Sequence, residues 1–161
     1  MNIKLLKLLN QNAKYSVHDL AVMLDMSDEE VKQEIESMER EGLIRGYKAV
    51  IDWEKLDGAY VSALIELKVS PQPDAGFEDI AKRIMKFNEV ESVYLMSGAF
   101  DLCVIVKGKT FQEVAMFVAK QLATMEYVLS TSTHFVLRRY KEQDIELVDS
   151  DVDDRRKISL C

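Results

Sequence analysis

Polar side chains recur at helical spacing in the segment SDEEVKQEIESMEREG, residues 27–42. Val31, Ile35 and Met38 stand at i, i+4 and i+7, so the segment predicts a helix from residue 28 to about residue 41 whose apolar face meets a core. The opposite face would carry groups that hydrogen-bond to base edges or phosphates. These groups are Glu29, Gln33, Ser37 and Arg40, with Glu30 and Glu36 beside them.

Several of these groups have a matching partner in DNA. Gln33 could pair with adenine, Arg40 with guanine or a phosphate, and Glu29 could accept a hydrogen bond from cytosine. Positive charge outside the helix could contact phosphates as well. The candidate DNA-binding residues are therefore Lys14, Gln33, Ser37, Arg40, Arg45 and Lys48.

The charge of this region opposes binding to a polyanion. Residues 17–43 hold nine acidic and two basic residues, a sum of −7, and the whole chain also carries −7. Two like charges about 4 Å apart repel by ~1 kcal/mol even in water, so any DNA binding should be weak and salt-sensitive. Helix stability explains part of the acid, because Asp28, Glu29 and Glu30 complement the dipole at the helix start. Glu36 and Arg40 stand at i, i+4, a spacing that favours an ion pair.

Two earlier helices and a strand pair are predicted around this segment. Residues 2–9 and Val17–Leu24 place apolar side chains at helical spacing. Ser16 and Ser27 are predicted N-caps, and Glu30 completes a capping box with Ser27. Residues 42–52 read as strand-like. Three short helices followed by a strand pair predict a winged helix-turn-helix.

The pattern changes to strands and helices in the order βαββαβ after residue 60. Residues 61–69 alternate with a period of two, and strands are also predicted at 90–97, 101–107 and 127–140. Helices are predicted at 77–87 and 111–123. This order is typical of a ferredoxin-like antiparallel sheet with both helices on one face. A second copy of the chain could cover the other face.

The chain is therefore predicted to be an α+β protein, with a winged helix-turn-helix domain followed by a ferredoxin-like sandwich domain. We expect the first domain at residues 1–52, a linker at 53–59, the second domain at 60–141 and an acidic tail at 142–161. The tail has seven acidic and three basic residues, and it could contain one short strand at 145–148.

Composition argues against several classes of protein. No apolar run approaches the roughly 20 residues that cross a bilayer and no signal peptide opens the chain, so we expect a cytoplasmic protein without membrane contact. Cys103 and Cys161 have no metal-binding spacing, and His18 and His134 are isolated. No catalytic set of residues stands out. We therefore expect neither an enzyme nor a metal or other cofactor.

Two motifs resemble the Lrp/AsnC, or feast/famine, family of bacterial and archaeal regulators. One is SG-FD at residues 97–101, within VESVYLMSGAFDLCVIV, and STSTHFVLRRYK follows later in the chain. The other is EG-I-GY-A--D, which comprises Glu41, Gly42, Ile44, Gly46, Tyr47, Ala49 and Asp52. The resemblance covers about residues 2–141. The acidic third helix departs from the family pattern, in which arginines and small polar residues are usual.

The resemblance implies a DNA-binding winged helix joined to a ligand-sensing domain, assembled as homodimers that often form octamers. It also implies that an amino acid binds between dimers near the 98–101 turn and the last strand. Gly98 offers an open amide, and the Asp101 carboxylate suits an α-ammonium group. The candidate effector-binding residues are Met96, Gly98, Ala99, Phe100, Asp101, Leu129, Ser130, Thr131, Ser132 and Thr133.

The function expected from these observations is that of an Lrp/AsnC-like transcriptional regulator, which binds DNA and senses a small metabolite at oligomer interfaces. One alternative is an amino-acid-sensing or protein-interaction module whose acidic winged helix has lost direct DNA binding. A tight hairpin with an ordinary threonine-rich strand is the structural alternative to the effector site.

Overall fold

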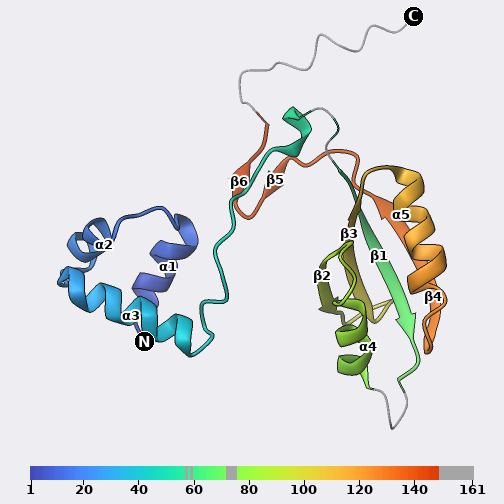
Figure 1. The fold of residues 1–161 in the computed structure, drawn as a ribbon, viewed down its shortest axis with the longest axis horizontal. Coiled ribbons are helices and arrows are strands. Elements are labelled where there is room, and N and C mark those ends of the chain that lie inside the picture. The colour runs from blue at the N-terminus through green and yellow to red at the C-terminus, as the bar shows by residue number, and fades with distance from the viewer. Residues whose placement is uncertain (57, 59, 72–75, 149–161) are drawn as a thin grey trace, which may run out of the picture. The chain divides into compact units, whose positions relative to one another are not determined.

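The computed structural model describes residues 1–56, 58, 60–71 and 76–148 (Figure 1). It divides the chain into two compact units, the N-terminal unit Met1–Ala49 and the C-terminal unit Val50–Cys161. The predicted domain limits at residues 52, 59 and 141 stay predictions. Cys161 and the part of the predicted tail from residue 149 onward lie outside the described residues.

Three helices form the N-terminal unit: α1 (Ile3–Gln11), α2 (Val17–Leu24) and α3 (Asp28–Arg40). Ser16 caps α2 and Ser27 caps α3, each in a capping box, so the caps predicted at both helix starts are confirmed. Helices this short gain most of their stability from packing. Their apolar faces meet in one core, which consists of Leu5, Leu20, Ala21, Val31 and Met38.

The strand pair predicted after α3 is wrong for this chain. The helix ends at Arg40 with Glu41 as its C-cap. The next residue, Gly42, has a left-handed φ of +71°, and the N–H groups of Leu43 and Ile44 both bond to the carbonyl of Met38. Residues 45–52 then run without helix or strand up to the short 3-10 turn η1 (Trp53–Lys55). A strand needs a neighbour for its hydrogen bonds, and none of the described residues pairs with this segment as a sheet.

The C-terminal unit confirms the predicted βαββαβ order. Its antiparallel sheet has the strand order β2-β3-β1-β4. The last strand of the sheet ends at residue 135, five residues before the predicted end. The elements are β1 (Val61–Val69), α4 (Phe77–Ile84), β2 (Val90–Leu95), β3 (Leu102–Gly108), α5 (Phe111–Phe117), the π-helical turn η2 (Val118–Leu122) and β4 (Val128–Phe135).

A short two-stranded hairpin follows the main sheet. It pairs β5 (Lys141–Glu142) with β6 (Ile145–Glu146), and its turn contains two left-handed residues, Gln143 and Asp144. The short strand that the sequence allowed at 145–148 is therefore observed as β6.

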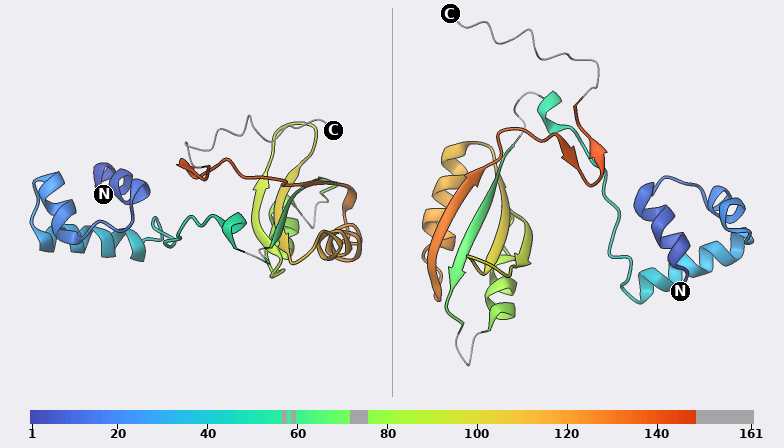
Figure 2. Two further views of the ribbon diagram at one scale, coloured as in Figure 1. Left: turned by 90° about the horizontal axis from the view of Figure 1, so that it is seen from above. Right: turned by 180° about the vertical axis from the view of Figure 1, so that it is seen from behind.

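One face of the sheet, here called the helix face, is buried under α4 and α5 (Figures 1 and 2). Ala63, Ile65, Leu67 and Val69 of β1 all point to it, as the alternation predicts, and each is at most 6% exposed. On the opposite side, here called the open face, none of the described helices of the C-terminal unit covers the strands. By register this face holds Leu64, Glu66, Tyr94, Cys103, Ile105, Ser132 and His134.

The second helix of the unit continues beyond its α-helical part as a π-helical turn. Val114, Phe117 and Val118 face the core, and a regular α-helix would next turn residue 121 inward. Instead the N–H of Ala123 bonds to the carbonyl of Val118 at 2.8 Å, an i→i+5 spacing, and Leu122 is the buried residue. The wider turn thus brings an apolar side chain rather than Gln121 into the core.

Candidate functional site

The predicted reading face of α3 is exposed, and its donors are bonded to neighbouring side chains. Gln33 Nε2 donates to Glu29 Oε1 at 3.1 Å, and Ser37 Oγ donates to Glu41 Oε1 at 2.9 Å. Arg40 Nη2 in turn donates to Ser37 Oγ at 3.4 Å. The helix therefore presents a surface on which carboxylates hold part of the hydrogen-bonding capacity of the candidate DNA contacts.

Carboxylates also line a shallow groove of about 270 Å³ along α3, bordered by Met26, Glu30, Gln33, Glu34 and Ser37.

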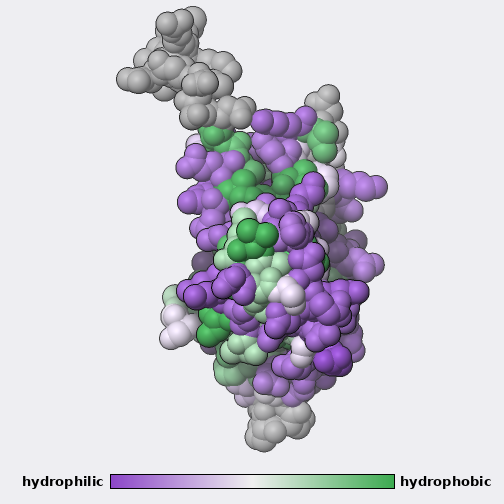
Figure 3. Space-filling model, turned by 90° about the vertical axis from the view of Figure 1, so that its left-hand side faces the viewer, coloured by the Kyte–Doolittle hydropathy of each residue, from purple (hydrophilic) through white to green (hydrophobic). Residues whose placement is uncertain are grey.

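Hydrophilic side chains cover most of the face seen in Figure 3, and apolar side chains lie there in small separate patches. No helix in the described part of the chain is long and apolar enough to cross a membrane.

The acidic residues at the helix starts have a structural role. The Ser27 N–H and the Ser27 hydroxyl both donate to Glu30 Oε2 at 2.8 Å, and together they lower the pKa of Glu30. In α2 the Ser16 hydroxyl, followed by the Ser16 N–H, lowers the pKa of Asp19 in the same way. Glu30 is therefore occupied at the start of α3 and is a poor candidate for contact with DNA.

The candidate basic residues lie outside the three helices. Lys14 is exposed in the turn between α1 and α2, and Arg45 and Lys48 are exposed in the segment after α3. A Cβ on Gly42 would lie 3.0 Å from Cζ of Arg45, so the guanidinium packs against the end of α3. Its position beside the helix suits a phosphate contact next to the reading face.

Sequence reasoning missed the contact that ties this segment to α3. Tyr47 Oη donates to Glu39 Oε1 at 2.9 Å, and partial burial followed by the Glu39 carboxylate raises the pKa of Tyr47. The two residues are eight positions apart on different elements. The only available signal was that a tyrosine follows an acidic helix within a short span.

In the second candidate site, Asp101 fixes the β2–β3 turn to the end of β1. Its Oδ2 accepts the N–H of Val69 at 2.8 Å, and its own N–H donates to the carbonyl of Leu67 at 2.9 Å. The N–H of Met96 closes the turn on the carbonyl of Asp101 at 2.8 Å. One carboxylate oxygen of Asp101 therefore has a structural role, and among the described residues Oδ1 has no hydrogen-bond partner.

The other turn residues are accessible. Gly98 and Ala99 are exposed and Phe100 is half-buried. A Cβ on Gly98 would meet no atom within 4 Å, so the amide is open to a ligand. Met96 is 42% exposed and Leu129 is 69% exposed, which leaves both side chains able to contact an apolar group.

The hydroxyls predicted on β4 lie on two faces of the sheet. Ser130 and Ser132 pair with Lys68 and Glu66 and lie on the open face. Thr131 and Thr133 pair with Leu67 and Ile65 and lie on the helix face, half-buried. Val69 pairs with Val128, so the β2–β3 turn and the start of β4 meet at the same end of the sheet. The structure thus brings Asp101 and the start of β4 together and separates the two pairs of hydroxyls.

A polar cluster on the open face was not predicted. His134 Nε2 lies 3.4 Å from Glu66 Oε1 and 3.3 Å from Ser132 Oγ. Cys103 pairs with Glu66 across the strands, and burial, then the Glu66 carboxylate, raises the pKa of this thiol. The thiol therefore stays protonated and unreactive at neutral pH. Only the register of β1, β3 and β4 reveals that these residues are neighbours.

A second small pocket, of about 190 Å³, lies within the C-terminal unit. Ser62 is part of its lining and is 3% exposed, and among the described residues its Oγ has no hydrogen-bond partner. The Trp53 and Tyr60 rings, 5.4 Å apart, stand beside it. The pocket is lined by Trp53, Glu54, Tyr60, Val61, Ser62, Phe111, Val136, Leu137 and Arg139.

Comparisons with solved structures give the same overall fold. E. coli AsnC matches with a TM-score of 0.65 at 20% identity, over 86% of this chain and 91% of that chain. A transcriptional regulator of Neisseria meningitidis, solved as an L-Met complex, matches with a TM-score of 0.70 at 24% identity, over 87% of this chain and 90% of that chain. At these identities the likeness concerns the fold.

Comparisons of sequence reach further. The model of the Lrp/AsnC ligand binding domain matches residues 62–145. The HTH-type transcriptional regulator YugG of Bacillus subtilis is 42% identical over 95% of this chain and 92% of its own length. The leucine-responsive regulatory protein of Haemophilus influenzae is 27% identical over 88% of this chain and 85% of its own. These relatives are regulators of transcription and do not favour the alternative of a module without DNA binding. This chain belongs to the Lrp/AsnC family of HTH-type transcriptional regulators.

Proposed function

We propose that this regulator binds DNA through α3 and the basic residues next to it, and that an amino acid changes this binding from the C-terminal unit. The observation that carries the DNA half is the exposed polar face of α3, on which Gln33 and Arg40 stand outward in a three-helix unit. Helices in this position of a helix-turn-helix lie in the major groove. The protein would act in the cytoplasm, where it meets DNA.

The strength of DNA binding depends on few positive charges. Lys14, Arg45 and Lys48 are exposed, whereas residues 17–43 sum to −7. Each phosphate contact releases counterions, so binding by so few contacts is weak at physiological salt and changes steeply with salt. Two or more copies on one DNA molecule would raise the total affinity through effective concentration.

The open face supports assembly with a second copy. Leu64 and Ile105 lie at its centre and are only partly buried, while Tyr94 is 53% exposed. A bare face of this kind is covered when two identical sheets pack together, and a two-fold interface uses the same patch on both copies. We propose a homodimer built on this face. The higher assembly would be an octamer of chains, made of four such dimers.

The effector of this proposal is a neutral amino acid with an apolar side chain. Asp101 Oδ1 and the Gly98 amide lie at one end of the sheet, where they can bind the ammonium and carboxylate groups. Met96 and Leu129 can contact the side chain of the amino acid. The relative from Neisseria was solved with L-Met, which fits this class. A neighbouring dimer would complete the site, because a single chain offers only one wall.

Fluorescence anisotropy with genomic fragments recovered by the purified protein tests the DNA half at low and physiological salt. The variant Arg45→Glu with Lys48→Glu should weaken binding at least tenfold at low salt, because two phosphate contacts become repulsive. The control Lys86→Glu with Lys109→Glu carries the same charge change on exposed residues of the C-terminal unit and should bind nearly as wild type. Equal binding by both variants would remove these residues from the interface.

Calorimetric titration with single L-amino acids tests the effector half. Asp101→Asn keeps an oxygen that accepts the N–H of Val69 but removes the charge that attracts the ammonium group, so it should bind the amino acid at least tenfold more weakly with an unchanged circular dichroism spectrum. Asp79→Asn is the matched control, because Asp79 is an exposed carboxylate on α4. Unchanged affinity in Asp101→Asn would refute the assignment.

A further inference from the structure

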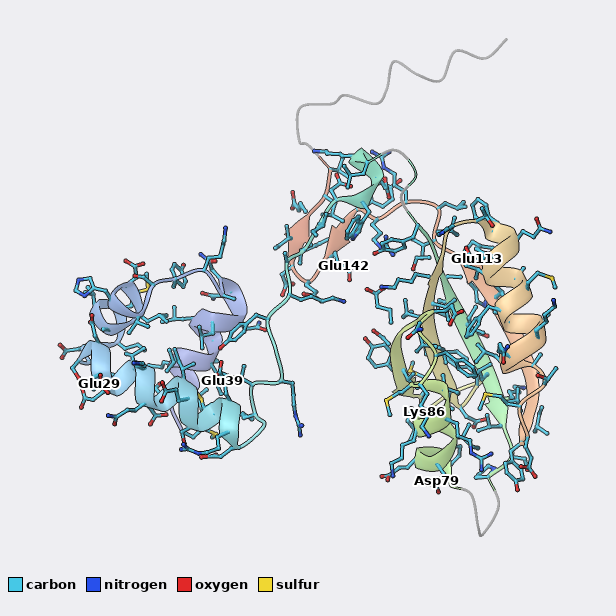
Figure 4. All side chains as sticks on the ribbon, in the orientation of Figure 1. Glu29, Glu39, Asp79, Lys86, Glu113 and Glu142 are labelled. Atoms are coloured by element: carbon cyan, nitrogen blue, oxygen red, sulfur yellow. The ribbon has the colours of Figure 1, made fainter. Side chains whose placement is uncertain are left out.

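Two side chains on α3 form a bonded pair at the position where a helix-turn-helix meets the bases. Glu29 is in the first turn of α3 (Figure 4). Gln33 is one turn later, and its Nε2 donates to Glu29 Oε1 at 3.1 Å. Both are exposed. In helix-turn-helix proteins the N-terminal residues of the reading helix contact base edges, so this pair occupies the reading position.

The bond determines which groups the pair can offer to a base. Glu29 is acceptor-only, and with Oε1 taken by Gln33 it keeps Oε2 as a free acceptor. Gln33 uses one N–H for Glu29 and keeps the other N–H together with its Oε1. The outward pattern is therefore one charged acceptor beside one neutral acceptor–donor pair.

Few base edges match this pattern. In the major groove only cytosine N4 and adenine N6 donate hydrogen bonds, and adenine N7 beside N6 matches the acceptor–donor pair of a glutamine. A guanine O6 or a thymine O4 opposite Glu29 would place an acceptor against a carboxylate. That arrangement leaves a charge desolvated and unpaired, which disfavours the wrong base strongly.

We propose that Glu29 and Gln33 act as one reading unit, which selects a cytosine adjacent to an adenine in each half of the operator. This inference rests on the proposed DNA binding and deepens it. Glu29 selects the cytosine amino group, and Gln33, held in position by Glu29, selects the adenine. The acid on the reading helix thus lowers affinity for every sequence while it raises discrimination between sequences.

Three other carboxylates on α3 or directly after it do not share this role. Glu30 is bonded to Ser27 in the capping box, and Glu41 accepts the Ser37 hydroxyl beyond the last turn of the helix. Glu36 is exposed in the middle of α3 and is bonded to none of the described residues. It is the natural control, because its removal changes the charge of the helix by the same amount and leaves the pair intact.

Selection from a random-sequence duplex library, with the full chain at low salt, tests the proposal. Wild type should enrich half-sites that contain adjacent cytosine and adenine. Glu29→Gln should bind all DNA more tightly and lose about 10-fold or more of its preference for cytosine, the scale of one good base contact. Gln33→Ala should lose the preference for adenine. Glu29→Ala should lose the cytosine preference and part of the adenine preference, because Gln33 is no longer held.

Glu36→Gln should raise affinity and keep the base preferences of wild type. If Glu29→Gln enriches the same bases as wild type, the reading unit is wrong while DNA binding stands. The same conclusion follows if Glu36→Gln loses the preference equally. If no protein in the set enriches any sequence, the proposed DNA binding fails, and the reading unit fails with it.

Discussion

The two units of this protein differ in what holds them together. Among the described residues, five buried apolar side chains form the core of the N-terminal unit, and all come from three short helices. Thirteen form the core of the C-terminal unit, and seven of these come from β1 and β3, which pair across 30 or more residues. A small core leaves little stability in reserve, so the DNA-contacting unit depends on its caps and turns far more than the sheet does.

The surfaces of the two units also differ. The N-terminal unit exposes polar side chains hydrogen-bonded to carboxylates along α3, whereas the open face of the sheet carries half-buried apolar residues around one polar cluster. A charged helix surface is stable alone in water and responds to salt. A half-buried sheet face gains stability when another surface covers it. The first suits reversible contact with DNA and the second suits permanent assembly.

Substitutions in the two cores should have the largest effect and should show whether the two units unfold separately. Leu20→Ala removes a fully buried side chain from the N-terminal core and should cost about 2–5 kcal/mol, enough to unfold that unit while the sheet stays folded. Differential scanning calorimetry should show loss of one transition. Ile65→Ala, in the sheet core, is the reciprocal control and should lower only the other transition. If both variants lower both transitions, the two units unfold together.

Removal of both caps should have the next largest effect. Ser16→Ala with Ser27→Ala should destabilise the N-terminal unit by about 2 kcal/mol, or about 1 kcal/mol for each cap, in urea unfolding followed by circular dichroism. Thr110→Ala removes the corresponding cap of α5 and should affect only the C-terminal unit.

The caps should also make the N-terminal unit sensitive to acid. The pKa values of Glu30 and Asp19 are lowered in the folded unit by bonds from Ser27 and Ser16. Their contribution is therefore present above the ordinary carboxyl pKa and is lost as pH falls below about 4 through the lowered values. The melting temperature of the N-terminal unit should fall in that range, and the double cap variant should show a smaller fall. An equal fall in both proteins would contradict the assignment.

Two glycine substitutions, one in each unit, should change the free energy of unfolding by smaller and different amounts. Gly42→Ala forces a side chain into a left-handed φ of +71° and against Arg45, so it should cost about 1 kcal/mol in the N-terminal unit. Gly98 has no positive φ and open space around it, so Gly98→Ala should leave stability within about 0.5 kcal/mol of wild type. Chemical unfolding of both variants measures the difference, and a larger loss in Gly98→Ala would show that the turn is packed.

The smallest expected effect is at Ser62. Its buried Oγ has no partner among the described residues, so Ser62→Ala removes an unsatisfied group and only a small volume. The free energy of unfolding should stay unchanged or rise by up to about 1 kcal/mol. Ser92→Ala, at a half-buried position on β2, provides the comparison and should be neutral. A clear loss of stability in Ser62→Ala would mean that the hydroxyl is bonded in solution.

Local signals made most of the elements predictable. Ser27 with Glu30 and the spacing of Val31 and Met38 defined α3 almost to the residue, because a helix start and an apolar face are encoded within a few positions. The alternation of β1 was equally clear, and Ala63, Ile65, Leu67 and Val69 lie in the core while Val61, on the same face, is partly buried. Less of the candidate sites could be predicted, because the exposure of Gln33 or Gly98 can be inferred from nearby residues but their hydrogen-bond partners cannot.

The errors and omissions arose where distant residues meet. The strand pair after α3 was wrong because strand-like composition does not supply a neighbour. The hydrogen bond from the N–H of Val69 to Asp101 Oδ2, 32 positions away, was not predicted. The pairing of His134 with Glu66 likewise requires the β1–β4 register. Such contacts are fixed by topology, which no short stretch of sequence contains.

The π-helical turn after α5 has a consequence for how the length of this chain can vary. It holds one residue more than an α-helical turn would need to bring Leu122 to the core. Ala119 and Lys120 are exposed there, so the loss of either one would let the turn tighten into ordinary α-helix with Leu122 still inside. A one-residue deletion within a helix normally rotates all following side chains away from their positions. Here it would instead convert the π-helical turn into regular α-helix.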